Sequence, residues 1–295
     1  MKANEYSYSK RGGIFGTITA LVTAIAIVSA VLLCVYIDDT AAETYDENGI
    51  DVMILMYHNI IADGAKPSKY EINFSTLRED MKYLQEKGYR SIDSRDLIAY
   101  TQGKKTLPAK CVMLTFDDGY YSYMRYIPKL LDEFGMKAVV SVVGDYTRLN
   151  KNNPNISKKY TYLDFDDIGE LSRVKGVEIA LHSYDFHNID KTRKGAARAK
   201  GESEEEYAKT LTADSERLID ALEKVGVECV TYAYPYGSYS KSSDKILAKL
   251  GVKCTLTCNE GVNVIKKGDD LGLLMRYNRD GRWKSVEEIA YFRQR

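Results

Sequence analysis

The stretch CVMLTFDDG occupies residues 111–119 and decides the fold class. An apolar run rich in strand formers, CVMLTF, is bounded by Pro108 on one side and by two acidic residues and a glycine on the other. Such a run is typical of a strand buried on both faces of a parallel sheet. Ligands of α/β folds bind at the carboxyl ends of these strands. We therefore expect Asp117 and Asp118 to lie at a functional site, with an ordinary turn as the alternative because Asp and Gly are common in turns.

Two of the three histidines of the chain follow a second short apolar run, VEIALH at residues 177–182. His182 stands at the exit of this expected strand and His187 follows five residues later. Side chains on one helical face are three or four residues apart, so a loop must bring the second imidazole round. One carboxylate and two imidazoles leave room for water on Zn²⁺ or a similar divalent ion, which is a catalytic arrangement. The alternative is a structural, hydrogen-bonded histidine pair.

Two further polar residues follow apolar runs. DVMILMYHNI, residues 51–60, predicts a strand with His58 at its end. In LGLLMRYNRD, residues 271–280, Arg276 likewise follows an apolar run. In a closed barrel such strand ends converge. A histidine hydrogen-bonded within a loop and a surface arginine are the respective alternatives. The stretch VTYAYPYGSYS, residues 230–240, predicts a strand followed by a Pro-Gly turn.

Strands and helices alternate along the chain, which favours a parallel (β/α) barrel. A helix is expected over residues 73–88 and another over 202–226, each with one apolar face and a terminal Gly. A further helix is expected to run to Phe134 with Pro128 in its first turn. Strands are expected near residues 51–57, 111–116, 138–143, 177–182, 229–234, 252–257 and 271–276.

Taken together, TFDDG (115–119), HSYDFH (182–187) and AYPYG (233–237) resemble the motifs of the polysaccharide deacetylase domain, the NodB-homology or carbohydrate esterase family 4 domain. The resemblance covers roughly residues 51–280 and implies a distorted seven-stranded (β/α) barrel. It implies that Asp117 is the general base and that one divalent metal, Zn²⁺ first and Co, Ni or Fe as alternatives, is held by Asp118, His182 and His187. It also assigns substrate binding to Tyr234, Tyr236 and Gly237, with the Tyr236 amide on the oxyanion.

The chain departs from the family pattern at three points. The histidines are five rather than four residues apart, Ala233 replaces the Arg that commonly precedes the Pro-Gly turn, and no histidine follows His187 to act as a late acid. His58 is our candidate for the catalytic acid, with protonated Asp117 as the alternative. Arg276 is our candidate for the missing arginine beside Asp117. The motif style is most similar to that of deacetylases acting on exported poly-β-1,6-N-acetylglucosamine.

Residues 14–37 contain no charged residue. A helix over this segment, at about 1.5 Å per residue, is expected to be roughly 36 Å long, enough to cross a bilayer. Lys2, Lys10 and Arg11 precede the segment, and no Lys or Arg follows until Lys66. The positive-inside rule then predicts a cytoplasmic amino terminus at 1–13, a transmembrane signal anchor at 14–37, a linker at 38–50 and an extracytoplasmic catalytic domain at 51–295. A cleaved signal peptide is the alternative, although its apolar core is usually shorter.

Lys plus Arg equal Asp plus Glu at 42 each, so no bulk charge attracts nucleic acid. We expect a membrane-anchored, metal-dependent N-deacetylase of an exported or cell-wall polysaccharide, with a membrane-bound polysaccharide synthase as a candidate partner. A peptidoglycan deacetylase and an inactive glycan-binding relative are the alternatives. The cysteines at 111, 229, 254 and 258 are expected to be buried free thiols, with a Cys229–Cys254 bridge left open.

Overall fold

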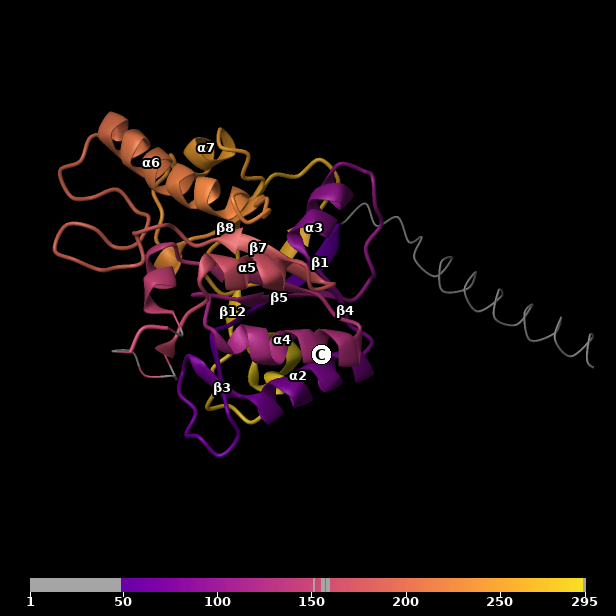
Figure 1. The fold of residues 1–295 in the computed structure, drawn as a ribbon. Coiled ribbons are helices and arrows are strands. Elements are labelled where there is room, and N and C mark those ends of the chain that lie inside the picture. Colours follow the sequence, from indigo (N-terminus) through magenta and orange to yellow (C-terminus); the bar gives the residue numbers. More distant parts are fainter. Residues whose placement is uncertain (1–48, 151, 155–156, 158–159, 294–295) are drawn as a thin grey trace, which may run out of the picture. The chain divides into compact units, whose positions relative to one another are not determined.

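A computed structural model describes residues 49–150, 152–154, 157 and 160–293 (Figure 1). The segment 14–37, expected to span a membrane, lies outside these residues, as do 1–13 and nearly all of the 38–50 linker. Within the described part of the chain, none of the helices combines the length and the apolar composition that crossing a membrane requires.

One large sheet organises the structure, and its strands follow the order β10-β1-β5-β6-β7-β8-β9-β11. Every neighbouring pair on this path is parallel except β1 with β10. β12 pairs with β1, and β4 pairs with the first half of β5. The strands are β1 (Ile50–Tyr57), β4 (Arg90–Ile92), β5 (Cys111–Phe116), β6 (Ala138–Val142), β7 (Val177–Leu181), β8 (Thr231–Ala233), β9 (Cys254–Leu256), β10 (Asn263–Ile265), β11 (Leu271–Leu274) and β12 (Tyr277–Asn278).

The two ends of this path approach each other, which makes the fold an α/β near-barrel. The side chain of Asn263, on β10, accepts from the amide of Met275 and donates to its carbonyl, both at 2.9 Å. The seven strands expected from the sequence all belong to the sheet, while β4, β10 and β12 were not expected. A separate small sheet pairs β2 (Asn59–Ile61) with β3 (Glu71–Asn73).

Helices cover the sheet and follow its strands along the chain. α2 and α4 pack side by side, and α6 packs with α7 (Figure 1). The capping box of α6, formed by Ser203 and Glu206, explains why that helix begins where it does. The helices are α2 (Phe74–Glu86), α3 (Ser94–Thr101), α4 (Ser122–Phe134), α5 (Phe165–Ser172), α6 (Glu204–Glu223), α7 (Ser243–Ala248) and α8 (Ala290–Arg293), with 3₁₀ turns η1 (Asp145–Leu149), η3 (Pro235–Gly237) and η4 (Val286–Glu288).

The expected start of the helix ending at Phe134 was wrong. Pro128 lies inside α4, which begins at Ser122 rather than near the proline. Proline lacks the amide that would bond to the residue four positions earlier, but buried packing of Tyr123, Ile127 and Leu130 holds the whole helix on the core. Tertiary contacts therefore outweigh the local cost of one missing backbone hydrogen bond.

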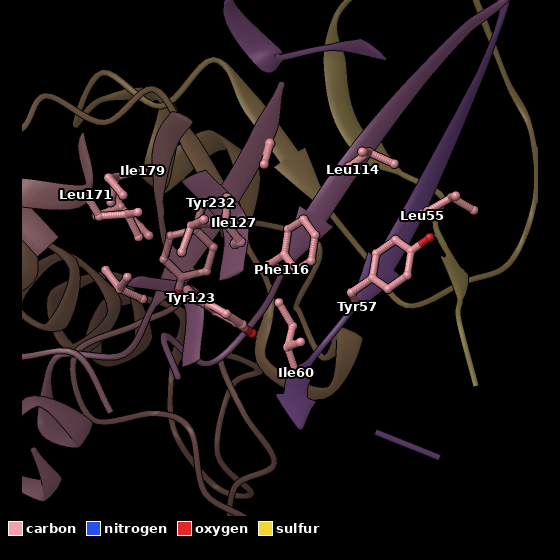
Figure 2. Packing of buried hydrophobic residues seen from close by; sticks show 14 of the residues in the cluster. Leu55, Tyr57, Ile60, Leu114, Phe116, Tyr123, Ile127, Leu171, Ile179 and Tyr232 are labelled. Atoms are coloured by element: carbon pink, nitrogen blue, oxygen red, sulfur yellow. The ribbon is translucent and has the colours of Figure 1, made fainter. Parts of the chain in front are cut away.

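Successive residues of the central strands enter opposite hydrophobic clusters, as expected for strands buried on both faces. On β1, Leu55 and Tyr57 belong to one cluster and Ile54 to the other; on β5, Phe116 and Met113 divide in the same way. Figure 2 shows Leu55, Tyr57, Leu114 and Phe116 within the first cluster, where the Tyr57 and Phe116 rings stack at 5.1 Å. The four cysteines at 111, 229, 254 and 258 are free thiols.

Candidate metal and catalytic site

The end of β5 separates two adjacent carboxylates. The amide of Asp117 donates to the Tyr57 carbonyl at 3.0 Å, which continues the β1–β5 ladder by one residue. Asp118 then turns into the left-handed region with φ 75°, followed by Gly119 at 71°. Such a conformation is costly for a residue other than glycine and is concentrated at functional sites. The turn sends the two side chains in different directions, so that they enter different interactions.

His182 is held at the end of β7 by its neighbours on both sides. Its amide donates to the Val142 carbonyl at 3.0 Å, and its Nδ1 lies 2.7 Å from the Ala233 carbonyl. A carbonyl can only accept, so Nδ1 carries the hydrogen and Nε2 is left with a lone pair facing Asp118, whose Oδ1 is 3.6 Å away. This is the arrangement by which proteins orient a metal-ligating histidine.

His187 reaches the same carboxylate from the loop after β7. Its Nε2 lies 3.0 Å from Asp118 Oδ1. On the other side of the ring, the hydroxyls of Tyr146 and Tyr236 lie 2.9 and 3.3 Å from Nδ1. The two phenol rings flank the imidazole, with ring centroids 5.3 and 4.7 Å away respectively. An Nδ1–H directed at these hydroxyls leaves the Nε2 lone pair toward Asp118.

The chemistry of these three residues fits a divalent cation. One ligand atom from each of Asp118, His182 and His187 lies within 4.8 Å of the others. Asp118 Oδ1 is buried and, among the described residues, makes no hydrogen bond of good geometry, although His187 Nε2 is near. With each Nδ1 directed at another partner, the two Nε2 atoms and an oxygen of Asp118 converge, a donor set that fits a tetrahedral Zn²⁺ with an open position. Burial raises the pKa of Asp118, but His182 and His187, when they carry hydrogen at Nε2, outweigh it and hold that pKa well below its ordinary value. The place therefore favours positive charge, which a bound cation also supplies.

Asp117 is paired with Arg276 from the other end of the domain. Nη1 and Nη2 of Arg276 donate to the two carboxylate oxygens at 2.9 and 2.8 Å, and both residues are buried. Nε donates to the Thr257 carbonyl and Nη1 also to the Thr115 hydroxyl, so the guanidinium is held in one orientation. Burial raises the pKa of Asp117, but Arg276 outweighs it and brings that pKa to about 2. Asp117 is therefore ionised at neutral pH.

A cavity of about 540 Å³ opens over these groups. His58 lines it beside Asp117, Asp118, His182 and His187, and its ring meets Tyr70 edge to face at 4.7 Å. Burial lowers the pKa of His58, and this exceeds the opposing influence of Asp118 and Asp117. Aromatic side chains form much of the remaining wall: Tyr70, Tyr120, Tyr236 and Trp283.

Of the other residues that the sequence indicated, Tyr236 alone is at the cavity. Tyr236 lines the cavity, but Tyr234 and Gly237 do not. The Tyr234 ring is fully buried and its hydroxyl donates to Asp244 at 2.5 Å. Gly237 packs under Cys258, where an added Cβ would lie 2.7 Å from the Cys258 backbone nitrogen. Arg276 likewise contacts Asp117 rather than the cavity.

Tyr146 and Trp283 are residues that the sequence did not single out. Tyr146 lies in the 3₁₀ turn after β6, and Trp283 lies beyond β12. Neither belongs to a periodic segment or to one of the three motifs. The abundance of tyrosine, 24 residues, is the only sequence feature that bears on Tyr146, and it does not bear on Trp283.

Residues 104–255 match the family model described as polysaccharide deacetylase. The matched range contains Asp117, Asp118, His182 and His187 but neither His58 nor Arg276. The poly-β-1,6-N-acetyl-D-glucosamine N-deacetylase of Escherichia coli (strain K12) is 24% identical over 269 residues, which cover 84% of this chain and 40% of that protein. This chain thus spans less than half the length of that relative.

Two solved structures share the fold. A de-N-acetylase from Aggregatibacter actinomycetemcomitans has a TM-score of 0.68 and 22% identity, covering 79% of this chain and 96% of that one. IcaB from Ammonifex degensii has a TM-score of 0.66 and 22% identity, covering 84% of this chain and 99% of that one. Both comparisons extend over almost the entire partner chain, so the shared fold includes nearly all of each of those structures.

Proposed function

Because the chain belongs to the polysaccharide deacetylase family, we propose that it hydrolyses the acetamide of N-acetylglucosamine residues in an exported or cell-wall polysaccharide. The observation that carries this proposal is the convergence of Asp118, His182 and His187 beside an ionised Asp117 at the base of one cavity. A glycan-binding protein has no need of that pairing of a cation site and a base. The name of the curated relative favours poly-β-1,6-N-acetylglucosamine as the substrate.

The proposed mechanism assigns Asp118, His182 and His187 to a divalent cation, with Zn²⁺ first. Bound there, such an ion supplies Lewis acidity, which polarises the acetyl carbonyl and acidifies water. Asp117 accepts the proton of the attacking water, and Arg276 keeps its carboxylate oriented and ionised. The amide of Tyr236, in a turn with φ 57°, donates to the oxyanion.

The departing amine needs a proton, for which there are two sources. His58 lines the same cavity as the motif residues and is our first candidate. Its lowered pKa means that the imidazole is largely neutral at pH 7, so it must gain a proton before it can act. Asp117, protonated in the first step, is the second candidate.

The experiment that tests the function measures acetate release by the purified full-length chain. Poly-β-1,6-N-acetylglucosamine, chitin oligomers and peptidoglycan are offered in parallel, with the Asp117→Asn variant as the control for contaminating activity. Release from the first polymer alone is expected. Release from peptidoglycan alone would replace the proposed substrate, and no release from any glycan would favour a binding protein without catalysis.

We also propose that residues 14–37 anchor the protein in the membrane with the catalytic domain outside, close to a polysaccharide synthase. The support is the uncharged segment itself and the basic residues that precede it. A linker of about 12 residues reaches at most roughly 40 Å, which keeps the domain near the membrane surface. A protease added to intact spheroplasts should digest the domain; protection until lysis would reverse the topology.

A further inference from the structure

Asp214, in the middle of α6, has both carboxylate oxygens bound to the loop that carries His187. Oδ2 accepts from the amide of Tyr184 at 2.9 Å and Oδ1 from the amide of Asp185 at 2.7 Å. Asp214 is 9% exposed. Two consecutive backbone amides therefore donate to one side chain, which comes from a helix that is distant in the sequence.

The loop needs such support because its path is unusual. His182 and His187 are five residues apart, and Ser183 directly after the first takes a left-handed conformation with φ 69°. The chain turns there, so the amides of Tyr184 and Asp185 leave the β7 ladder. Tyr184 is half-buried and Asp185 is exposed, but the amides of both are directed at the nearly buried Asp214, which supplies an acceptor to each and so ties the loop to α6.

The opposite side of the same loop is held by the segment after β6. The amides of Gly144 and Asp145 donate to the carbonyls of Ser183 and Tyr184 at 3.1 and 2.7 Å. The Tyr184 ring fits closely over Gly144, where an added Cβ would lie 2.4 Å from it. The guanidinium of Arg217, about one turn beyond Asp214, lies over that ring, 3.7 Å from its centroid. The loop is thus clamped between α6 and the β6 end.

We propose that Asp214 is a positioning residue for the cation site, which fixes the 183–187 loop so that His187 Nε2 meets Asp118. This rests on the proposed function, because it assumes that Asp118, His182 and His187 bind a divalent ion. Ligand distances in metal sites vary by only about 0.2 Å, so a small displacement of the loop weakens binding. Asp214 itself touches neither the cavity nor a proposed ligand.

The chain offers a matched control in Glu178. This buried carboxylate, at the start of β7, accepts from two consecutive amides, those of Ser94 and Arg95, at 3.0 and 3.3 Å. Its other oxygen accepts from the Thr231 hydroxyl at 2.9 Å. Glu178 lies at the amino end of the strand whose carboxyl end leads to His182. Glu178→Gln therefore disrupts the same kind of interaction at the end of the sheet away from the cation site.

The test measures the Zn²⁺ dissociation constant of the full-length metal-free protein by chelator competition, together with its melting temperature. Asp214→Asn keeps the size of the side chain but directs an amide group at one of the two loop amides. The dissociation constant is expected to rise about 10–100-fold, as for other residues that orient metal ligands. Glu178→Gln should lower the melting temperature and leave the dissociation constant within about twofold of the wild type.

A merely structural role would lower the melting temperature of both variants and leave Zn²⁺ binding alone. An Asp214→Asn protein that binds Zn²⁺ within about twofold of the wild type overturns the inference, as does an equal loss in both variants. If Asp214→Asn yields no folded protein, Asp214→Glu, which moves both oxygens by one methylene, is judged by the same criteria. Failure of the wild type to bind Zn²⁺ would instead refute the proposed function.

Discussion

Arg276 and Asp117 form a bidentate pair across 159 residues, at 2.9 and 2.8 Å, with both side chains withdrawn from solvent. Removing one member leaves the other as an uncompensated buried charge. Arg276→Met is therefore expected to lower the free energy of unfolding by about 3–5 kcal/mol. Urea denaturation measures this, and the double variant Arg276→Met/Asp117→Asn should recover part of the loss. If the double variant recovers none of the lost free energy of unfolding, the loss does not come from breaking the Arg276–Asp117 pair.

Replacing each of the two neighbouring carboxylates by an amide is expected to have different effects on metal content and activity. Asp117→Asn is expected to retain the metal and lose acetate release, because it removes the base but none of the proposed ligands. Asp118→Asn should lose both. Elemental analysis of the purified variants, beside activity assays, checks this, and equal metal loss in the two would contradict the assignment.

His58→Ala is expected to keep the metal and to lower kcat by roughly 10²–10⁴-fold, the usual scale for a general acid. The loss should be smaller for an acetyl ester, whose alkoxide needs less help to depart than an amine. Steady-state kinetics on paired amide and ester substrates measure the difference. Near-wild-type amidase activity would leave Asp117 as both base and acid.

Tyr146→Phe removes the hydroxyl that lies 2.9 Å from His187 Nδ1 and keeps the ring. Loss of this partner is expected to weaken Zn²⁺ binding about 10-fold, at the lower end of the range for such residues, because Tyr236 still lies near the same nitrogen. Tyr162→Phe is the control, since Tyr162 packs against Tyr146 at 4.6 Å in the same aromatic group. Chelator competition measures the Zn²⁺ affinity of both variants. Equal Zn²⁺ affinities of Tyr146→Phe and Tyr162→Phe would contradict the expectation.

Asp96 should make the stability depend on pH in the acid range. Burial raises its pKa, but hydrogen bonds from Lys105 and Lys137 outweigh this and hold the pKa below the ordinary value. A lowered folded-state pKa gives stability that is present above about pH 4 and is lost as the pH falls through the folded pKa. Asp96→Asn should flatten this part of the profile, measured by urea denaturation between about pH 2 and 5. An unchanged slope would show that Asp96 is not responsible.

The parts of the site that the sequence could predict are those attached to apolar strands. Phe116 and Leu181 end such strands, and Asp117, Asp118 and His182 follow at once, so their meeting follows from the sheet. Tyr146 could not be foreseen because it comes from a 3₁₀ turn without periodicity. For Arg276 a surface position stayed open, since a contact across 159 residues has no local signature.

The strands and helices of the fold also divide into those with a local sequence signal and those without one. Long apolar runs such as β1 and β5 were found from composition, whereas β12 has two residues and β10 has three, too few to produce a pattern. Pro128 was misplaced because local propensity favours the first turn of a helix, while the packing of α4 extends the helix before it. Where tertiary contacts decide, the local signal was insufficient or misleading.

The long separation of Asp117 and Arg276 also sets an order of events during biosynthesis. A ribosome adds about 5–20 residues per second, so Asp117 exists for roughly 8–30 s before its guanidinium partner is made. The same late segment supplies β12, which pairs with β1. A chain whose translation stops before residue 276 would carry all three proposed metal-binding residues beside a carboxylate with no countercharge. The Asp117–Arg276 pair is therefore completed only after all three proposed metal-binding residues have been made.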